Sequence, residues 1–364
     1  MPITAQAAVA YAPNARMEIE EVVLDPPREG EVVVELKAAG LCHTDLGVLE
    51  GHSPIYDKFP VVLGHEGAGV VVEVGPGVKE LRPGDHVICF AAECRVCASC
   101  RSPKGNFCES ALDYFGNPPT IHARGKDIYA GYGMGTFASR LVTREVALAK
   151  VRKDAPFDEI SYLSCGATTG VGAAVFTAQV EPGSSVVVFG LGGIGLNVLQ
   201  GARMAGATTI IGVDVNETKR DIALKLGATH FVNPREVQGD LVGHLNELTR
   251  GGADYTFEAV GNVKLMEQAL AAARVGWGVC TVIGVAPMGD QIGVGPFDLI
   301  MGRKLQGTAL GGVRRSQLPE LVDWLMEKRF DLKSLITDRM PLDRINEGYD
   351  AMRRGEGLRS ILVF

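Results

Sequence analysis

The chain has 364 residues and a formal net charge of −7, and it contains no block of lysine and arginine, which argues against a nucleic-acid-binding protein. No signal-peptide pattern, no run of about 18 apolar residues and no density of cysteine typical of a disulfide scaffold occurs, so neither a membrane partner nor an oxidising compartment is expected. A cytoplasmic protein of two domains, with a small molecule as partner, is the expectation.

Residues 1–150 contain short runs of β-branched residues separated by turns, for example at 31–40, 67–78 and 138–151. This spacing is typical of strands joined by tight connections, and it predicts an antiparallel, barrel-like domain.

Residues 167–310 follow a different rhythm, in which an apolar strand, a glycine-containing turn and an amphipathic helix repeat. Such alternation predicts a doubly wound parallel sheet, so the fold class is α/β. Beyond residue 310, we expect helices over 316–330 and 342–355 and a closing strand over 358–364 that returns to the first domain.

Four of the eight cysteines fall within residues 94–108, with the spacing C-x2-C-x2-C-x7-C. Two-residue gaps allow successive thiolates to converge on one point, which suits tetrahedral zinc better than a set of disulfides. The predicted ligands are Cys94, Cys97, Cys100 and Cys108.

Gly190, Gly192 and Gly195 form a G-x-G-x-x-G pattern directly after an apolar strand and directly before a helix. Glycines there permit a tight turn and a close approach of backbone amides to a pyrophosphate. Asp214, 19 residues past Gly195, ends the second strand, where a carboxylate binds ribose hydroxyls and repels a 2′-phosphate. The pattern favours NAD over NADP; glycines that merely allow a helix to pack on a sheet are the alternative.

Cys42, His65 and Cys165 would together make a Cys2His set that leaves the fourth position of zinc open, as a catalytic site requires. A buried apolar cysteine or a histidine in a turn is the alternative for each of them. Separations of 23 and 100 residues do not by themselves show that the three meet.

The segments "CHTD", "LGHEGAG", "CGATTG", "FGLGGIGL" and "LRSILVF", with the cysteine cluster, resemble the zinc-dependent medium-chain alcohol dehydrogenases. The resemblance runs almost end to end and is closest to the class III branch of glutathione-dependent formaldehyde dehydrogenases. It implies a GroES-like catalytic domain over 1–166 and 311–364, and a Rossmann coenzyme domain over 167–310.

The resemblance implies two Zn²⁺ per chain: a structural ion in the cysteine cluster, and a catalytic ion held by Cys42, His65 and Cys165 with Glu66 close behind. Asp45 is expected to orient His65, although Asp45 or Glu66 could instead be an ordinary turn residue.

Thr44 matches the hydroxyl that takes the proton of the alcohol. Many relatives continue that relay to a histidine at the position of Gly47, so the proton must leave here through water or another group. His52 lies nearby at the wrong offset, and a solvated loop histidine is its simpler interpretation.

The resemblance also implies a set of coenzyme-binding residues. These are His43 and Arg359 for the pyrophosphate, Gly190, Gly192, Gly193 and Gly195 in the turn, Asp214 and Lys219 for the adenosine ribose, and Thr169 and Ile194 for the nicotinamide. The alternative for Arg359 is a solvated charge near the end of the chain.

Phe90 and Phe137 match positions that wall the alcohol pocket in relatives; barrel core is the alternative for both. The segment 109–135 keeps the long loop of dimeric relatives, so we expect a homodimer.

Relatives that use glutathione hold their substrate with acidic residues and an arginine, where this chain has Ser53, Ile55 and Leu112. Each lost charge-assisted hydrogen bond is worth about 1.5–3 kcal/mol. We therefore expect NAD-dependent oxidation of medium-chain or aromatic primary alcohols. The alternatives are a thiol-adduct formaldehyde dehydrogenase or dismutase, and a non-catalytic binding protein that retains the fold.

Overall fold

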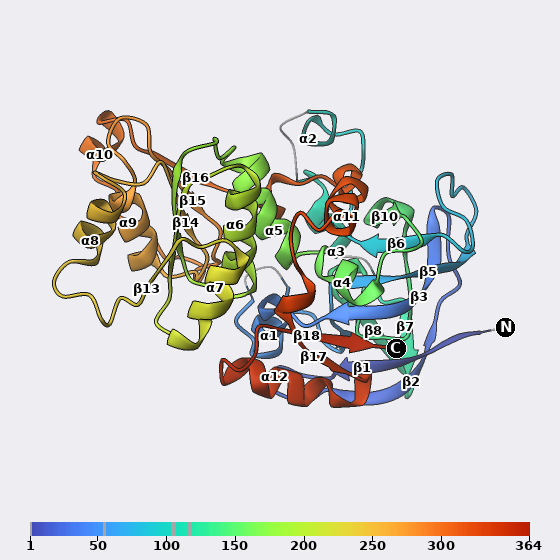
Figure 1. Ribbon diagram of the computed structural model, residues 1–364. Coiled ribbons are helices and arrows are strands. Elements are labelled where there is room, and N and C mark those ends of the chain that lie inside the picture. The colour runs from blue at the N-terminus through green and yellow to red at the C-terminus, as the bar shows by residue number, and fades with distance from the viewer. Residues whose placement is uncertain (1, 54–55, 103–106, 116–117) are drawn as a thin grey trace. The chain divides into compact units, whose positions relative to one another are not determined.

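The computed structural model describes residues 2–53, 56–102, 107–115 and 118–364 (Figure 1). The chain divides into two compact units. The barrel unit comprises Met1–Cys165, Arg314–Glu327 and Leu332–Phe364, and the parallel-sheet unit comprises Gly166–Val313 and Lys328–Asp331.

The barrel unit contains a closed barrel, in the order β1-β2-β7-β8-β4, and a seven-stranded sheet, in the order β10-β6-β5-β3-β18-β17 with β9 also paired to β3. The barrel strands are β1 Ile3–Ala10, β2 Glu18–Leu24, β4 Val61–Val62, β7 Ile121–Ala123 and β8 Lys126–Ala130. The sheet strands are β3 Glu31–Gly40, β5 Glu66–Val74, β6 His86–Cys89, β9 Arg140–Arg144, β10 Leu148–Val151, β17 Ile336–Met340 and β18 Arg359–Val363. The helices are α1 His43–Leu49, α2 Ala98–Arg101, α3 Ala111–Phe115, α4 Phe157–Tyr162, α11 Leu318–Met326 and α12 Ile345–Arg353.

Strand β3 is central to this sheet because it pairs with β5, β9 and β18. Val32, Val34 and Leu36 are at most 1% exposed, as expected of a strand that is covered on its apolar face. The antiparallel pairing of Ile361 with Gly40 places the last strand of the chain beside the end of β3 (Figure 1).

The parallel-sheet unit has six strands in the order β13-β12-β11-β14-β15-β16, and all of its pairings are parallel. The strands are β11 Ser185–Phe189, β12 Thr209–Val213, β13 His230–Val232, β14 Tyr255–Glu258, β15 Val279–Val282 and β16 Lys304–Gly307. The helices are α5 Gly166–Gly172, α6 Gly193–Met204, α7 Arg220–Leu226, α8 Leu241–Leu248, α9 Val263–Ala272 and α10 Pro296–Ile300.

Helices α8 and α9 cover one face of this sheet, and α5, α6 and α7 lie on the other (Figure 1). Val186, Val187, Val188 and Phe189 of β11 are therefore almost completely buried, which explains why the strand is apolar without alternation. The strand order reverses between β11 and β14, and in such sheets ligands bind at the carboxyl ends of the strands at that point. The predicted fold class, a barrel domain plus a doubly wound parallel sheet, is confirmed.

Within the residues described, no helix has both the length and the apolar character needed to cross a lipid bilayer.

The hairpin of β7 and β8 is held by His122, whose two ring nitrogens face two carboxylates. Nε2 lies 2.9 Å from Asp25 Oδ1, and Nδ1 lies 2.9 Å from Asp127 Oδ1. The hydrogen bond to Asp25 is the largest cause of a raised pKa of His122. Since the folded pKa exceeds the unfolded one, this stabilisation is fully present below the unfolded pKa of about 6.5 and is lost as pH rises through the folded value.

We predict that His122→Gln lowers Tm by about 1–3 °C at about pH 5.5 and by less at about pH 9. The effect is small because the side chain is 40% exposed and water screens the two ion pairs. Calorimetry of both proteins at the two pH values provides the measurement. An equal difference in Tm at both pH values would contradict a protonated bridge.

Candidate functional site

Cys42, His65, Glu66 and Cys165 come together in the barrel unit, and one candidate ligand atom from each lies within 4.8 Å of the others. The fold brings them together at the ends of elements. Cys42 follows β3 and is the N-cap residue of α1, His65 directly precedes β5, and Cys165 lies between α4 and α5.

We call Cys42, His65 and Cys165 the Cys2His group. Their sulfur and nitrogen atoms are donors that fit zinc. Tetrahedral zinc with bonds of about 2.0–2.3 Å holds its ligand atoms about 3.3–3.8 Å apart, so atoms within 4.8 Å need only a small movement. All eight cysteines are free thiols. Two thiols and one imidazole would leave a fourth position open.

Asp45 fixes the orientation of the His65 ring. Its side chain is fully buried, its Oδ2 lies 3.1 Å from His65 Nδ1, and its Oδ1 accepts a hydrogen bond of 2.9 Å from the Gly64 amide. The Nε2 atom of His65 is thereby left to face a metal. Burial opposes protonation of His65, but Asp45 and then Cys42 raise its pKa well above the ordinary value.

The two thiols of the group shift each other's pKa in opposite directions. The contact with Cys165, followed by the charge of His65, brings the pKa of Cys42 well below its ordinary value. The same contact raises the pKa of Cys165, and burial adds to the effect. Thr44 Oγ1 lies 3.6 Å from Cys42 Sγ, which puts the predicted relay hydroxyl beside the group.

Arg359 is buried behind this group and has three kinds of partner. Its Nη1 donates to the Leu41 carbonyl at 2.6 Å and to the Glu66 carboxylate oxygens at 3.1 and 3.0 Å. Its guanidinium carbon lies 4.1 Å from the centroid of the Tyr162 ring. With 8% exposure, Arg359 is not a solvated charge, so that alternative is wrong.

The partners of Arg359 lie beside the metal-ligand candidates along the chain. Leu41 precedes Cys42, Glu66 follows His65, and Tyr162 stands three residues before Cys165. Burial raises the pKa of Glu66 above its ordinary value, and the charge of Arg359 opposes that rise. Glu66 lies within reach of a metal, but its carboxylate already has Arg359 as its partner.

The four clustered cysteines also converge, with their sulfur atoms within 4.8 Å of one another. Backbone amides point at the sulfurs: Cys97 N donates to Cys94 Sγ at 3.3 Å, Cys100 N to Cys97 Sγ at 3.3 Å, and Ser110 N to Cys108 Sγ at 3.4 Å. The amide of Cys100 lowers the pKa of Cys97 to about 6. Four thiols with amide donors form a closed set for a structural zinc ion.

The glycine turn of the parallel-sheet unit fits a dinucleotide. Gly190 has a φ of +90°, and a Cβ on Gly195 would lie 1.8 Å from the Gly190 carbonyl oxygen, so both positions require glycine. A Cβ on Gly192 would meet nothing within 4 Å, which leaves an open cradle at the start of α6. Gly192 is the N-cap residue and offers no side-chain cap, and uncapped helix starts of this kind are where phosphates bind.

Apart from its predicted role at the ribose, the Asp214 carboxylate makes hydrogen bonds within the chain that the sequence pattern does not reveal. Its Oδ2 accepts hydrogen bonds from the Leu191 amide at 2.8 Å and from Lys219 Nζ at 2.9 Å, and its Oδ1 accepts one from the Asn216 amide at 2.8 Å. The carboxylate therefore ties the glycine turn to the loop after β12 and holds Lys219 beside it.

The remaining coenzyme candidates are dispersed over elements of both units. Thr169 is buried in α5, Gly193 and Ile194 lie in the first turn of α6, and His43 is the first residue of α1. Their contacts with the coenzyme, and that of Arg359 with the pyrophosphate, stay predictions.

Phe137 lies in the core of the barrel unit. Its ring has no exposed surface, belongs to the barrel core and packs edge-on against Tyr349, with ring centroids 6.1 Å apart. This packing is what the core alternative expects, and the role of Phe137 as a pocket wall stays a prediction. Phe90 is 1% exposed, and its role as a pocket wall stays a prediction.

The positions at which the chain departs from glutathione-using relatives are only partly described. Ser53 Oγ accepts a hydrogen bond of 3.2 Å from the Tyr56 amide and so shapes its own loop. Ile55 and the side chain of Leu112 lie outside the described residues. His52 is exposed, in agreement with a solvated loop histidine.

Sequence patterns missed Tyr132, whose ring lies edge-on to His65 with the ring centroids 5.1 Å apart. Its backbone is left-handed, with φ +54°, which is strained for a bulky residue and frequent near functional sites. The run of glycines around it was the available signal.

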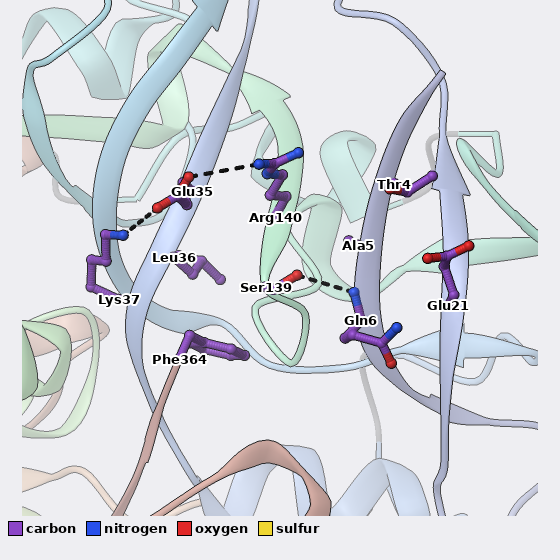
Figure 2. A pocket seen from close by; sticks show the side chains of 10 residues that line it. All are labelled: Thr4, Ala5, Gln6, Glu21, Glu35, Leu36, Lys37, Ser139, Arg140 and Phe364. Carbon is purple, nitrogen blue, oxygen red and sulfur yellow. Dashed lines mark hydrogen bonds and ion pairs between the residues drawn. The ribbon is translucent and has the colours of Figure 1, made fainter. Parts of the chain in front are cut away.

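A separate hollow of about 350 Å³ opens on the barrel unit between β1, β3, β9 and Phe364 (Figure 2). Among its charged side chains, Glu35 pairs with Lys37 and with Arg140. None of the predicted site residues lines it.

Comparisons with known proteins show which proteins the chain is similar to. Residues 28–153 match the family described as alcohol dehydrogenase GroES-like domain, and residues 193–327 match the family described as zinc-binding dehydrogenase. The chain is 50% identical to the alcohol dehydrogenase class-3 of Cereibacter sphaeroides and 49% identical to the S-(hydroxymethyl)glutathione dehydrogenase of Paracoccus denitrificans, and both matches cover 99% of each chain. The crystal structure of an alcohol dehydrogenase zinc-binding domain protein from Burkholderia ambifaria is 36% identical, covers 100% of both chains and has a TM-score of 0.95.

These relatives overturn the expected substrate. We expected primary alcohols rather than a glutathione adduct because three charged contacts are missing, yet the two relatives of 49–50% identity carry class-3 and S-(hydroxymethyl)glutathione dehydrogenase names. The physical reason for the error is that a few ionic contacts of about 1.5–3 kcal/mol each tune affinity and do not define the reaction.

Gly40 offers a test of the Glu66–Arg359 ion pair. A Cβ at Gly40 would lie 2.1 Å from Glu66 Oε2, so Gly40→Ala must displace the carboxylate. Breaking a buried ion pair costs about 3–5 kcal/mol. We predict a clearly lower Tm, and zinc content falling from about two ions per chain toward one as the Cys2His group loosens.

Gly47→Ala is the matched control, because a Cβ there meets nothing within 4 Å. It should leave Tm and zinc content almost unchanged. Adding Glu66→Asp to Gly40→Ala should restore part of the loss, since the shorter side chain makes room. A Gly40→Ala protein that matched the wild type in both measurements would refute the role given to the pair.

Proposed function

Because the chain belongs to the zinc-dependent medium-chain alcohol dehydrogenase family, within its class III branch, we propose that it oxidises S-(hydroxymethyl)glutathione with NAD. The observation that carries this proposal is the 49–50% identity, over 99% of the chain, to enzymes named for that branch. The chain is an NAD-dependent zinc dehydrogenase, and its two cysteine-containing groups fit one catalytic and one structural ion.

The proposed reaction removes a hydride and a proton from the hydroxymethyl group of the adduct. The hydride leaves the carbinol carbon and the proton leaves its oxygen, so the products are S-formylglutathione, NADH and one proton. A bound zinc ion supplies Lewis acidity that lowers the pKa of the hydroxyl, and NAD supplies the electron acceptor.

Cys42, His65 and Cys165 would hold the catalytic ion, and Asp45 would keep the His65 ring turned so that Nε2 faces it. Thr44, whose hydroxyl lies 3.6 Å from Cys42 Sγ, would accept the substrate proton. Gly47 offers no next acceptor, so the proton would pass from Thr44 to water.

In the parallel-sheet unit, the amides at the start of α6 would bind the pyrophosphate of NAD over Gly192, where no Cβ intrudes. Asp214 would accept hydrogen bonds from the ribose hydroxyls with its remaining lone pairs, and Lys219 is already fixed beside it.

We also propose a homodimer in the cytoplasm. Apolar side chains are strongly exposed on the parallel-sheet unit at Val285, Met288, Phe297 and Ile300, each 71–77% exposed, in the segments that flank β15 and the edge strand β16. A second copy that covered them would remove this surface from water. Eight free cysteines favour a reducing compartment.

The substrate proposal is tested by NADH formation from formaldehyde with and without glutathione. We predict that turnover depends on glutathione, and that kcat/KM for the adduct exceeds that for octan-1-ol by at least about 100-fold, a difference of about 2.7 kcal/mol in transition-state binding. Equal rates with and without the thiol would refute it.

Thr44 is tested by a conservative pair of substitutions. Thr44→Ala should lower kcat by about 100-fold or more, because the proton acceptor is lost, whereas Thr44→Ser should retain most of the activity. Zinc content, measured in parallel, should stay at the wild-type value in both. Similar kcat in all three proteins would rule out the relay.

A further inference from the structure

Glu258 is a buried acid at the carboxyl end of β14. Its side chain has no exposed surface, and one carboxylate oxygen, Oε1, accepts hydrogen bonds from three successive backbone amides. These are the amides of Val260 at 3.0 Å, Gly261 at 2.8 Å and Asn262 at 3.2 Å. A buried carboxylate is costly unless such donors compensate it.

The main chain of Glu258 holds a second loop. Its carbonyl accepts from the amides of Ile283 at 2.9 Å and Gly284 at 3.0 Å, just after β15. Gly284 packs so closely that a Cβ there would lie 2.6 Å from Glu258 Oε2. Glu258 thus accepts hydrogen bonds from both the loop after β14 and the loop after β15.

The loop held by the carboxylate, residues 259–262, lies against the glycine turn. The Ala259 amide donates to the Phe189 carbonyl at 2.9 Å, and a Cβ on Gly190 would lie 2.3 Å from Val260 Cγ2. This contact is at the carboxyl ends of β11 and β14, where the strand order reverses and a doubly wound sheet binds its ligand.

Capping of α9 does not account for the carboxylate. Asn262 is the N-cap residue of that helix, and its own Oδ1 accepts from the Leu265 amide at 3.2 Å. The acceptor supplied by Glu258 therefore goes mainly to the loop and not to the helix.

We propose that Glu258 is a positioning residue for NAD, whose carboxylate holds residues 259–262 against Gly190 so that the coenzyme meets a preformed wall. Preorganisation lowers the ordering cost of binding, so the residue acts on coenzyme affinity without touching the reacting atoms. The inference rests on the proposed coenzyme site at Gly190–Gly195 and is independent of which alcohol or thiol adduct is oxidised.

The test compares Glu258→Leu and Glu258→Gln with Thr256→Val. Thr256 is a matched control because it is fully buried in the same strand and donates to the Ala269 carbonyl of α9 at 2.8 Å, away from the loop. The measurements are the Kd for NADH, from the fluorescence of the bound reduced coenzyme, and Tm.

Glu258→Leu should raise the Kd for NADH by about tenfold or more, because three amides lose their acceptor. Glu258→Gln keeps an acceptor oxygen without the charge and should raise Kd by about two- to fivefold. In both, KM for NAD should rise while kcat changes less than about twofold. Thr256→Val should lower Tm and leave Kd within about twofold.

An unchanged Kd in Glu258→Gln and Glu258→Leu, or an equal rise in Thr256→Val, would overturn the proposal. If Glu258→Leu does not fold, the Kd of Glu258→Gln for NADH decides whether the proposal stands. Failure of the wild-type protein itself to bind NADH would instead refute the coenzyme site on which the inference rests.

Discussion

The buried ion pair between Glu66 and Arg359 is the constraint on which the metal-ligand group depends. Each charge would cost several kcal/mol if it stood alone in this environment, so β5 and β18 cannot move apart without a large penalty. Arg359 also binds the Leu41 carbonyl and stacks on Tyr162, so one side chain sets the backbone near all three ligand candidates. Through Arg359, the last strand of the chain therefore helps to position Cys42 and His65, which lie much earlier in the sequence.

Local patterns were sufficient to predict the parallel-sheet unit, because each strand, glycine turn and helix there is specified by neighbouring residues. The positive φ of Gly190 and the close packing of Gly195 are local requirements that the sequence displays directly. The Cys2His group differs: only the resemblance to a family predicted that distant residues would meet, since spacing carries no such information.

Other features could not be predicted, because they depend on tertiary partners. Nothing in the segment "LRSILVF" indicates that Arg359 is buried against Glu66, and nothing around Phe137 separates a pocket wall from barrel core. Glu258 was within reach of sequence reasoning, since it is the charged residue that ends an otherwise uncharged strand, and the short loop 259–262 separates it from a helix. The substrate was misjudged because contacts remote from the reacting carbon were taken to define the reaction.

The hydrogen bonds of Asp214 to its own chain, together with its proposed role at the ribose, have a consequence for any exchange of the coenzyme. If Asp214 binds the adenosine ribose as proposed, replacing it with a small neutral residue would remove the charge that repels a 2′-phosphate. The same change would leave the Leu191 and Asn216 amides without their acceptor and release Lys219. Redesign for the phosphorylated coenzyme must therefore supply a substitute acceptor for the turn, such as a serine or asparagine oxygen at the same depth. A single substitution of Asp214 would therefore alter coenzyme selectivity and at the same time weaken the glycine turn.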